Sequence, residues 1–410
     1  MKTKLHTLLL LVGLLASVPV HAGELTVGPR LEMTHPGKGH EVQLSGPAVA
    51  VDRAGGVVVA WITHEGQANH LYVGRPGTEA SKAVRVNPEG LTVDSLHQPP
   101  GLAIGPGGEL YLSWSSAKAK PEGVLFASDL RLSRSIDGGQ SFESPLRVND
   151  DRSIAHSFEG LAAAADGTVV LSWIDSRDGW DQASTHVARI GERGTRVDGV
   201  VTLDRDTCVC CRSQITTGPN NTVAVTWRKV FPGDIRDMVV SLSQDGGQSF
   251  TPSTLVHADR WQLNACPHRG GSVAFDSRGQ TYLTWYTEGE QGKPVVLFAR
   301  SADGQRFTAP LRLDTSTGSI PDHVRLAVDA AGRAVIVWED STAVRRRVLL
   351  RASTDGGLTF SPIQSLSPAL KAYAPDVAVS PTGGFVVAWH EEQFPMIKTI
   401  VHPLRFKDER

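Results

Sequence analysis

One pattern that recurs seven times along the 410-residue chain limits the folds open to it. Each copy begins with a short, mainly apolar segment, passes through a turn that contains glycine, and ends in an alternating run that closes on tryptophan. The copies align without a gap and span 47–61, 100–114, 159–173, 213–227, 271–285, 324–338 and 375–389. Successive tryptophans are 53, 59, 54, 58, 53 and 51 residues apart. A repeat of this period predicts one array of equivalent units rather than several independent domains.

The residues of each copy predict two antiparallel strands. In the first copy, residues 48–51 and 57–61 are mainly valine and alanine, and the turn between them holds Asp52 and two glycines. A third strand, such as residues 295–300, then a turn and a fourth strand follow the tryptophan. Four strands in a unit of about 55 residues are typical of a β-propeller blade. We therefore predict an all-β protein with a single β-propeller domain at 23–410, whose tryptophans pack between blades.

The two ends of the chain suggest how the ring closes. The last copy runs out after a third strand near residues 397–404. A strand from residues 24–33 would supply the missing fourth strand and remove an exposed sheet edge. Seven copies predict seven four-stranded blades, with six as the alternative if one copy is degenerate.

Residues 1–22 have the pattern of a secretory signal peptide. Lys2 and Lys4 precede an apolar run at 8–15, and Val20-His21-Ala22 fits a cleavage site for small residues. No other long apolar stretch follows, so we expect no membrane span and an exported protein, periplasmic or extracellular. The 41 basic and 43 acidic residues leave a net charge of −2, which argues against a nucleic-acid surface built on bulk charge. We expect a monomer.

A second repeated motif lies between the third and fourth predicted strands. Ser-x-Asp-Gly-Gly-x-Ser/Thr-Phe occurs at 135–142, 243–250 and 353–360, with a shortened form at 301–307. The aspartate caps the turn backbone and the glycines take positive φ. These turns resemble the Asp boxes of the sialidase (BNR-repeat) superfamily of β-propellers, of which the chain would be a divergent, non-classical member. The resemblance implies a ligand site on the face opposite these turns.

The same resemblance implies a set of catalytic residues. In sialidases three arginines bind a sugar carboxylate, a tyrosine assisted by a glutamate is the nucleophile, and an aspartate is the acid/base. The residues of this chain at comparable places are Glu159, Arg212, Arg269, Asp322 and Tyr373. The N-terminal Arg-Ile-Pro motif of the family is absent, and six blades are its norm.

Cysteines and histidines gather where the innermost predicted strands begin. They are His97, His156, Cys208, Cys210, Cys211, Cys266 and His268. All but Cys211 stand 17 or 19 residues before the tryptophan of their copy. In a propeller these positions surround the axis on one face, so we expect the side chains to lie near one another.

Three interpretations of this group stay open. The group could bind a metal ion, since thiolates with an imidazole suit zinc or copper. Cys266 could form a disulfide with Cys208 or Cys210, or the Cys-x-Cys-Cys run could be a redox site. Our first hypothesis is an exported propeller that binds Cu or Zn at this axial-face Cys/His site. The alternatives are an exo-sialidase-type glycoside hydrolase acting on acidic glycans, and a non-catalytic glycan- or protein-binding propeller with disulfide-bonded cysteines.

Overall fold

The computed structural model describes residues 24–35, 43–66, 68–77, 82–94, 98–177, 182–289, 291–315, 318–393 and 396–407. These residues form antiparallel β-sheets joined by turns, with short 3-10 turns such as Pro219–Asn221 and no α-helix. No helix in this part of the chain is long and apolar enough to cross a membrane. The all-β prediction is confirmed, and the predicted signal peptide at 1–22 lies outside the described residues.

Three of the sheets contain four strands that pair in chain order. The first holds β8 (Gly101–Ile104), β9 (Leu110–Ala117), β10 (Ser128–Ser135) and β11 (Leu146–Arg147). The second holds β20 (Gly271–Phe275), β21 (Thr281–Thr287), β22 (Val295–Ser301) and β23 (Leu311–Arg312). The third holds β24 (Ile320–Val328), β25 (Ala334–Ser341), β26 (Arg346–Ser353) and β27 (Gln364–Ser365).

Two further sheets depart from this plan. One holds β3 (Gln43–Leu44), β4 (Ala48–Val51), β5 (Val57–Glu65), β6 (Ala68–Gly74) and β7 (Val84–Arg85), with β3 and β4 both on β5. The other contains two copies of the repeat, in β12 (His156–Ala163), β13 (Val169–Asp175), β14 (Ala183–Gly191), β15 (Arg196–Thr207), β16 (Gln214–Thr217), β17 (Val223–Phe231), β18 (Ile235–Ser243) and β19 (Thr254–Leu255). These two copies merge where Thr207 pairs with Lys229.

The last sheet joins the two ends of the chain. It holds β28 (Ala372–Val379), β29 (Phe385–Gln393), β30 (Met396–Phe406), β1 (Leu25–Val27) and β2 (Leu31–Thr34). Both N-terminal strands pair antiparallel with β30, β1 through Leu25 opposite Phe406 and β2 through Leu31 opposite Val401. The N-terminal segment therefore occupies the fourth-strand position of the last copy.

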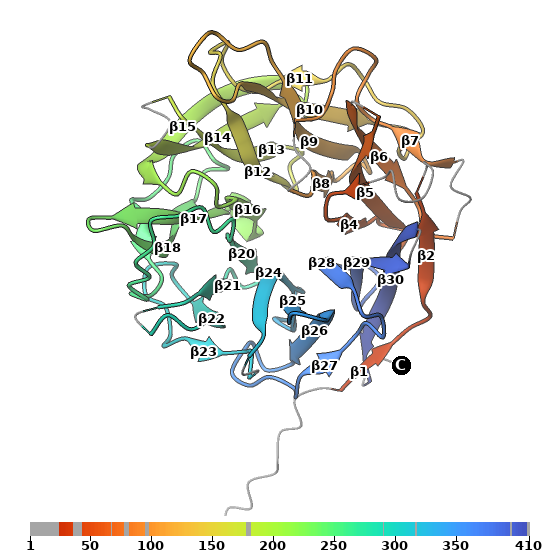
Figure 1. The fold of residues 1–410 in the computed structure, drawn as a ribbon, viewed down its shortest axis with the longest axis vertical. Coiled ribbons are helices and arrows are strands. Elements are labelled where there is room, and N and C mark those ends of the chain that lie inside the picture. The colour runs from red at the N-terminus through yellow and green to blue at the C-terminus, as the bar shows by residue number, and fades with distance from the viewer. Residues whose placement is uncertain are drawn as a thin grey trace, which may run out of the picture.

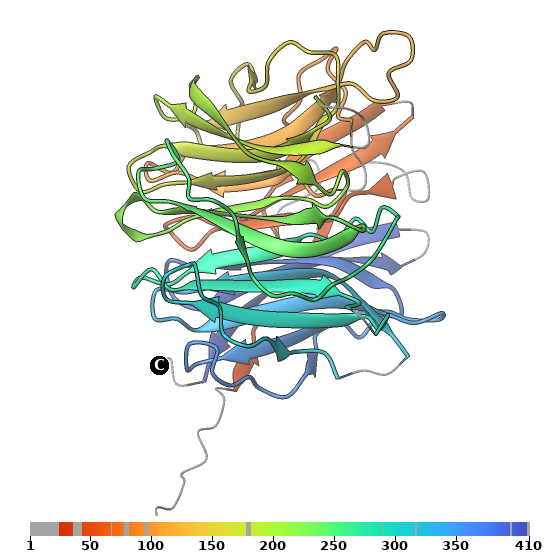
Figure 2. The ribbon, with the colours of Figure 1, turned by 90° about the vertical axis from the view of Figure 1, so that its left-hand side faces the viewer.

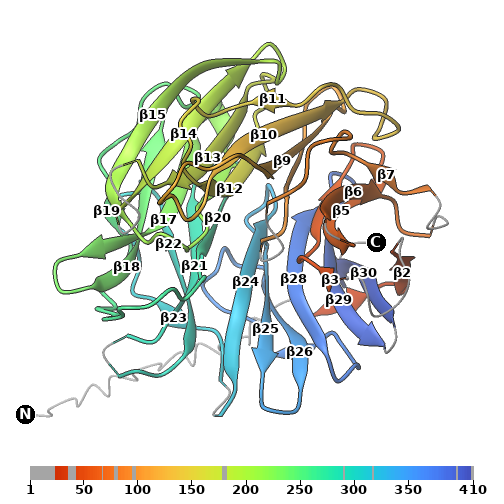
Figure 3. The same ribbon diagram turned by 45° about the horizontal axis from the view of Figure 1, so that its top comes forward.

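The first strands of the copies surround the middle of the molecule (Figures 1 and 3). In order they are β4, β8, β12, β16, β20, β24 and β28, and each contacts the next, while β28 contacts β4. In the side view the strands run across the thickness of the molecule (Figure 2).

The apolar core is divided among the junctions between consecutive copies. Seven clusters of buried hydrophobic residues each join one copy to the next, and the cluster of Met33 and Trp61 joins the last copy to the first. Each cluster contains one tryptophan of the repeat, at most 1% exposed: Trp61, Trp114, Trp173, Trp227, Trp285, Trp338 and Trp389. The predicted packing of these tryptophans between copies is confirmed. A large flat side chain fills the space between two sheets well.

The third-to-fourth strand turns have the predicted internal hydrogen bonds. The carboxylate of Asp355 accepts the backbone N–H groups of Leu358 and Thr359, both at 2.9 Å. Gly356 and Gly357 adopt φ of 71° and 76°. Asp137, Asp245 and Asp303 accept backbone N–H groups in the same way. These turns lie at the opposite end of the strands from the start of β20 and β24.

Candidate functional site

Three of the innermost strands, β12, β24 and β28, contain a bulge near their first residues. Phe158, His323 and Ala374 have φ of 58°, 48° and 51°, and each stands 15 residues before its tryptophan. The strand register shifts at the same points. A positive φ outside glycine costs about 1 kcal/mol or more, so the surrounding structure must impose it.

A narrow pocket opens on this face, between the starts of several innermost strands. Its polar lining residues are Gln98, Arg212, Gln214, His268, Arg269, Tyr286, Asp322, His323 and Arg325. The enclosed volume is about 50 Å³. Because one water needs about 10 to 15 Å³ of such space, the pocket has room for a small polar group of a few heavy atoms. We call it the axial pocket.

Arg212 supplies a positive charge that no described carboxylate pairs directly. Its Nε donates a 2.6 Å hydrogen bond to the backbone carbonyl of Glu159. No hydrogen bond or ion pair joins its terminal nitrogens to any residue in the described ranges. Burial lowers the pKa of Arg212 to about 10, and neighbouring Arg325 acts in the same direction. An anion that entered the pocket would relieve this unfavourable burial of charge.

The other two arginines of the pocket have acidic partners. Nη2 of Arg269 lies 3.0 Å from Oδ2 of Asp322. Nε of Arg325 lies 3.7 Å from Oδ1 of Asp376, and burial lowers the pKa of Arg325. Burial also raises the pKa of Asp376. Each partner stabilises the charged form of the other and so offsets part of the effect of burial.

A tyrosine and a glutamate are paired at the edge of the pocket. The hydroxyl of Tyr286 donates a 2.6 Å hydrogen bond to Oε1 of Glu288. The guanidinium of Arg269 lies over the Tyr286 ring, 4.5 Å from its centroid. Burial raises the pKa of Tyr286, and the bond to Glu288 adds to the effect. The hydroxyl therefore stays protonated unless the carboxylate removes its proton.

Tyr373, which the resemblance names as the nucleophile, is not among the residues that line the pocket. Its ring lies 5.1 Å from the guanidinium carbon of Arg346 and 5.7 Å from the ring of His390. Burial raises the pKa of Tyr373. No carboxylate accepts a hydrogen bond from its hydroxyl within the described residues. The catalytic role of Tyr373 stays a prediction.

The remaining residues implied by the resemblance lie around the pocket. Asp322 lines it, and its Oδ1 accepts the backbone N–H of His323. Glu159 is buried beside Arg212, and burial raises the pKa of Glu159. Nδ1 of His323 lies 3.1 Å from Oε2 of Glu339, whose carboxylate accepts the hydrogen bond. Burial opposes the protonation of His323, yet the bond to Glu339 leaves its pKa raised.

Three of the four cysteines form a buried cluster beside the pocket. The sulfurs of Cys208, Cys210 and Cys211 all lie within 4.8 Å of one another. The sulfur of Cys208 is 3.0 Å from that of Cys211 and 3.9 Å from that of Cys210. These contacts lower the pKa of Cys208. Phe158 and Val230 pack against the cluster.

The other members of the predicted Cys/His group do not join this cluster. Cys266 is exposed, and all four cysteines are free in the structure. The ring of His268 lies 6.0 Å from that of Phe158 and lines the axial pocket. His156 is buried elsewhere, with Nδ1 2.7 Å from the carbonyl of Ser128. His97 lies outside the described residues.

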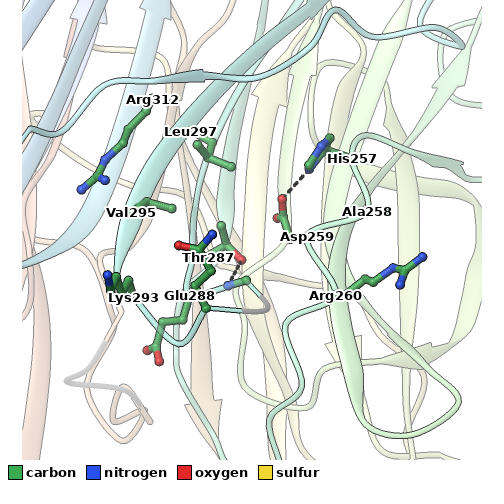
Figure 4. A pocket seen from close by; sticks show the side chains of 12 residues that line it. His257, Ala258, Asp259, Arg260, Thr287, Glu288, Lys293, Val295, Leu297 and Arg312 are labelled. Atoms are coloured by element: carbon green, nitrogen blue, oxygen red, sulfur yellow. Dashed lines mark hydrogen bonds and ion pairs between the residues drawn. The ribbon is translucent and has the colours of Figure 1, made fainter.

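A wider groove of about 620 Å³ lies beside the axial pocket. Figure 4 shows His257 and Asp259 on one side of it and Lys293 and Arg312 on the other. Asp259 accepts a 2.7 Å bond from His257 and a 2.6 Å bond from the indole of Trp285. Glu288 lines the groove and bonds Tyr286 of the axial pocket, so this pair links the two cavities.

Several residues that line or adjoin the axial pocket were not predicted from the sequence. Gln214, Arg325 and the nearby Asp376 all stand 13 residues before their tryptophan. A polar residue recurring at one position of an otherwise apolar strand was the available signal. Tyr286 gave no comparable signal, because it directly follows a tryptophan that is explained by packing.

Comparisons with known proteins identify a shared fold. No family model and no curated protein matches the sequence. The polysaccharide lyase Uly1 is similar at a TM-score of 0.54, with 11% identity over 95% of this chain and 100% of that chain. A protein of unknown function from Dyadobacter fermentans DSM 18053 gives 0.53, with 13% identity over 93% of this chain and 99% of that chain. The Hadza microbial sialidase Hz136 gives 0.51, with 13% identity over 86% of this chain and 77% of that chain. The chain therefore has the propeller-like all-β fold of these proteins.

Proposed function

We propose that this exported protein is a closed seven-bladed β-propeller that binds a carboxylated sugar of an acidic glycan in the axial pocket and cleaves its glycosidic bond. One observation carries the proposal. Three arginines, Arg212, Arg269 and Arg325, line one small pocket, and Arg212 has no carboxylate partner among the described residues.

Several features favour seven blades and closure. Seven hydrophobic clusters join consecutive copies, and one of them includes Met33 from the N-terminal segment. The contact of β28 with β4 and the pairing of β1 and β2 with β30 bring the two ends of the array together. A six-bladed ring would leave one of these junctions unexplained. The Asp turns on the opposite face fit a divergent member of the sialidase superfamily.

The size and charge of the pocket define the substrate class. A carboxylate has three heavy atoms, so it fits in a space of about 50 Å³. Guanidinium groups bind carboxylates through paired, charge-assisted hydrogen bonds. The sugar ring would then lie at the mouth of the pocket. Sialic acids and uronic acids both carry the required carboxylate, in keeping with a sialidase and a polysaccharide lyase among the similar structures.

The bond between Tyr286 and Glu288 supplies the geometry of a nucleophile and its base. In the hydrolytic route that the resemblance implies, tyrosine attacks the anomeric carbon while a carboxylate takes its proton. The 2.6 Å separation allows that transfer, and Arg269 over the ring favours the negative charge that develops on the oxygen. Asp322, which also lines the pocket, would act as the acid that protonates the leaving group only after it takes up a proton and its ion pair with Arg269 opens.

Two substrate panels test this function. Fluorogenic sialosides report hydrolysis by fluorophore release, and uronic-acid polymers report lyase action by the ultraviolet absorbance of the unsaturated product. We expect turnover of one panel, lost in Tyr286→Phe and kept in Tyr373→Phe. Loss only in Tyr373→Phe would restore the assignment made from the resemblance. Binding without turnover would support the non-catalytic alternative, and absence of binding to either panel would overturn the proposal.

A second function, the binding of a soft or borderline metal ion, is favoured by a different observation. The sulfurs of Cys208, Cys210 and Cys211 lie within 4.8 Å of one another, a spacing that one ion can bridge. Copper or zinc suits such thiolates. Metal analysis of protein purified under reducing conditions, with thiol counting, tests this function, and protein that binds neither metal would exclude it.

A further inference from the structure

We infer that the cysteine cluster is a three-coordinate Cu(I) site made by Cys208, Cys210 and Cys211 alone, without Cys266 or a histidine. This inference rests on the proposed metal binding and goes further, because it fixes the ion, its oxidation state and its ligand number. It does not depend on the sugar chemistry of the axial pocket.

The positions of the three sulfurs fit one ion at the centre of a triangle. A metal about 2.3 Å from three sulfurs in one plane sets the sulfurs about 4 Å apart. The measured separations from Cys208 are 3.0 Å to Cys211 and 3.9 Å to Cys210, and the third is no longer than 4.8 Å. Small side-chain rotations would bring all three to the required distance. The backbone already gathers them, since the N–H of Cys211 lies 3.4 Å from the carbonyl of Cys208.

Among the described residues, no fourth ligand atom joins the three sulfurs in a group within 4.8 Å. Within the described residues, the group of metal-ligating side chains contains the three cysteines and no histidine or carboxylate. Phe158 packs against the sulfurs, and its ring centroid lies 6.0 Å from that of His268. Zinc in a structural site takes four ligands, whereas soft thiolate sites with low coordination suit Cu(I). The ligand set therefore favours Cu(I) over zinc.

Two arginines provide the charge that such a site needs. One Cu(I) with three thiolates carries two negative charges, which burial makes costly unless cations lie nearby. Nη1 of Arg236 donates to the sulfur of Cys208 at 3.2 Å and to the carbonyl of Ala265 at 2.8 Å. Arg228 is fully buried and acts electrostatically on Cys211, and its carbonyl accepts the N–H of Cys208 at 2.9 Å. Two guanidinium groups thus offset the two negative charges.

The test uses the full-length protein, reduced and kept under anaerobic conditions. Cu(I) is supplied from a chromophoric chelator complex, and its transfer to the protein is followed by the loss of chelator absorbance. We expect one Cu(I) per chain, released protons from the thiols that are not already ionised, and an X-ray absorption spectrum with three sulfurs at about 2.3 Å. Cys208→Ser, Cys210→Ser and Cys211→Ser should each lose binding by about 100-fold or more.

Matched variants separate this inference from general metal binding. Cys266→Ser and His268→Gln should keep the wild-type Cu(I) affinity, and Arg236→Gln should weaken it by about 10- to 100-fold as the loss of an outer-shell partner. Tight zinc binding with loss in Cys266→Ser would overturn the Cu(I) inference and leave metal binding standing. Reduced protein that binds neither ion would overturn both.

An alkylation experiment covers the case in which a cysteine variant does not fold. Because the three thiols are buried in the folded protein, N-ethylmaleimide is added to wild-type protein at a denaturant concentration that exposes them when no metal is present. Cu(I) should then protect three thiols and leave Cys266 reactive, as mass spectrometry of the labelled peptides would show. Equal labelling with and without Cu(I) at that denaturant concentration contradicts the inference. A Cys208–Cys211 disulfide that persists under the reducing conditions used for loading would contradict it as well.

Discussion

Arg212 and Glu159 connect two neighbouring innermost strands, because the Nε of Arg212 donates a 2.6 Å hydrogen bond to the backbone carbonyl of Glu159. Glu159 lies in β12, and Arg212 directly precedes β16. The bond holds the guanidinium in the lining of the axial pocket without neutralising its charge. A fixed, unneutralised cation next to Arg269 and Arg325 explains why an anion is the expected ligand.

Replacing Arg212 by methionine should abolish the anion preference of the pocket. The methionine side chain is apolar and shorter than that of arginine, so the pocket loses the Nε bond to Glu159 and one charge-assisted contact with the anion, worth about 1.5 to 3 kcal/mol. Isothermal titration with a carboxylated sugar should show an affinity loss of about 10- to 150-fold. Arg306→Met, at an exposed site on the opposite face, is the control and should bind as the wild type does. Equal affinity in both variants would place the anion elsewhere.

The bond between His323 and Glu339 should stabilise the fold more at acidic than at alkaline pH. Since the bond raises the pKa of His323, its contribution is fully present below the unfolded pKa near 6.5 and is lost as pH rises through the folded value. His323→Gln should therefore lower the unfolding free energy at pH 5.5 and have a smaller effect at pH 9. Denaturant unfolding at the two pH values measures this difference. A deficit that is the same at both would show that His323 acts by packing alone.

Gly270 should tolerate no side chain, whereas Gly199 should. A Cβ at Gly270 would overlap the backbone carbonyl of Arg212, so Gly270→Ala should cost about 1 to 3 kcal/mol and displace the pocket arginine. A Cβ at Gly199 in β15 meets nothing within 4 Å. Gly199→Ala should leave stability unchanged or raise it by up to about 1 kcal/mol. Thermal unfolding of the two variants measures the contrast, and equal stability would refute the close approach at the axis.

Met33→Ala tests whether the N-terminal segment closes the ring. Met33 is 6% exposed and lies in the cluster with Trp61 that joins the last copy to the first. Removing its side chain should cost about 2 to 5 kcal/mol of unfolding free energy, as for other buried methionines. Met396→Ala, at a 42% exposed position, should cost little. If the two variants unfold at the same denaturant concentration, the N-terminal strand does not seal this junction in solution.

Much of the architecture follows from local pattern. The recurring tryptophan, the β-branched strands and the Asp turns each depend on residues within one copy, and every copy meets the same neighbours. The predicted burial of all seven tryptophans was correct for that reason. Even the N-terminal segment could be predicted to pair with the last copy, because an unpaired sheet edge is costly.

The composition of the sites depended on the tertiary structure. His268 and Cys210 occupy the same position of their copies, yet Cys210 lies in the buried sulfur cluster and His268 lines the axial pocket. Phe158, which adopts a positive φ, packs against the sulfurs, and its ring centroid lies 6.0 Å from that of His268. The repeating unit and its packing surface follow from the sequence alone. Which side chains meet at the axis depends on the folded molecule, because residues from different copies approach one another there at distances set by bulges, burial and charge.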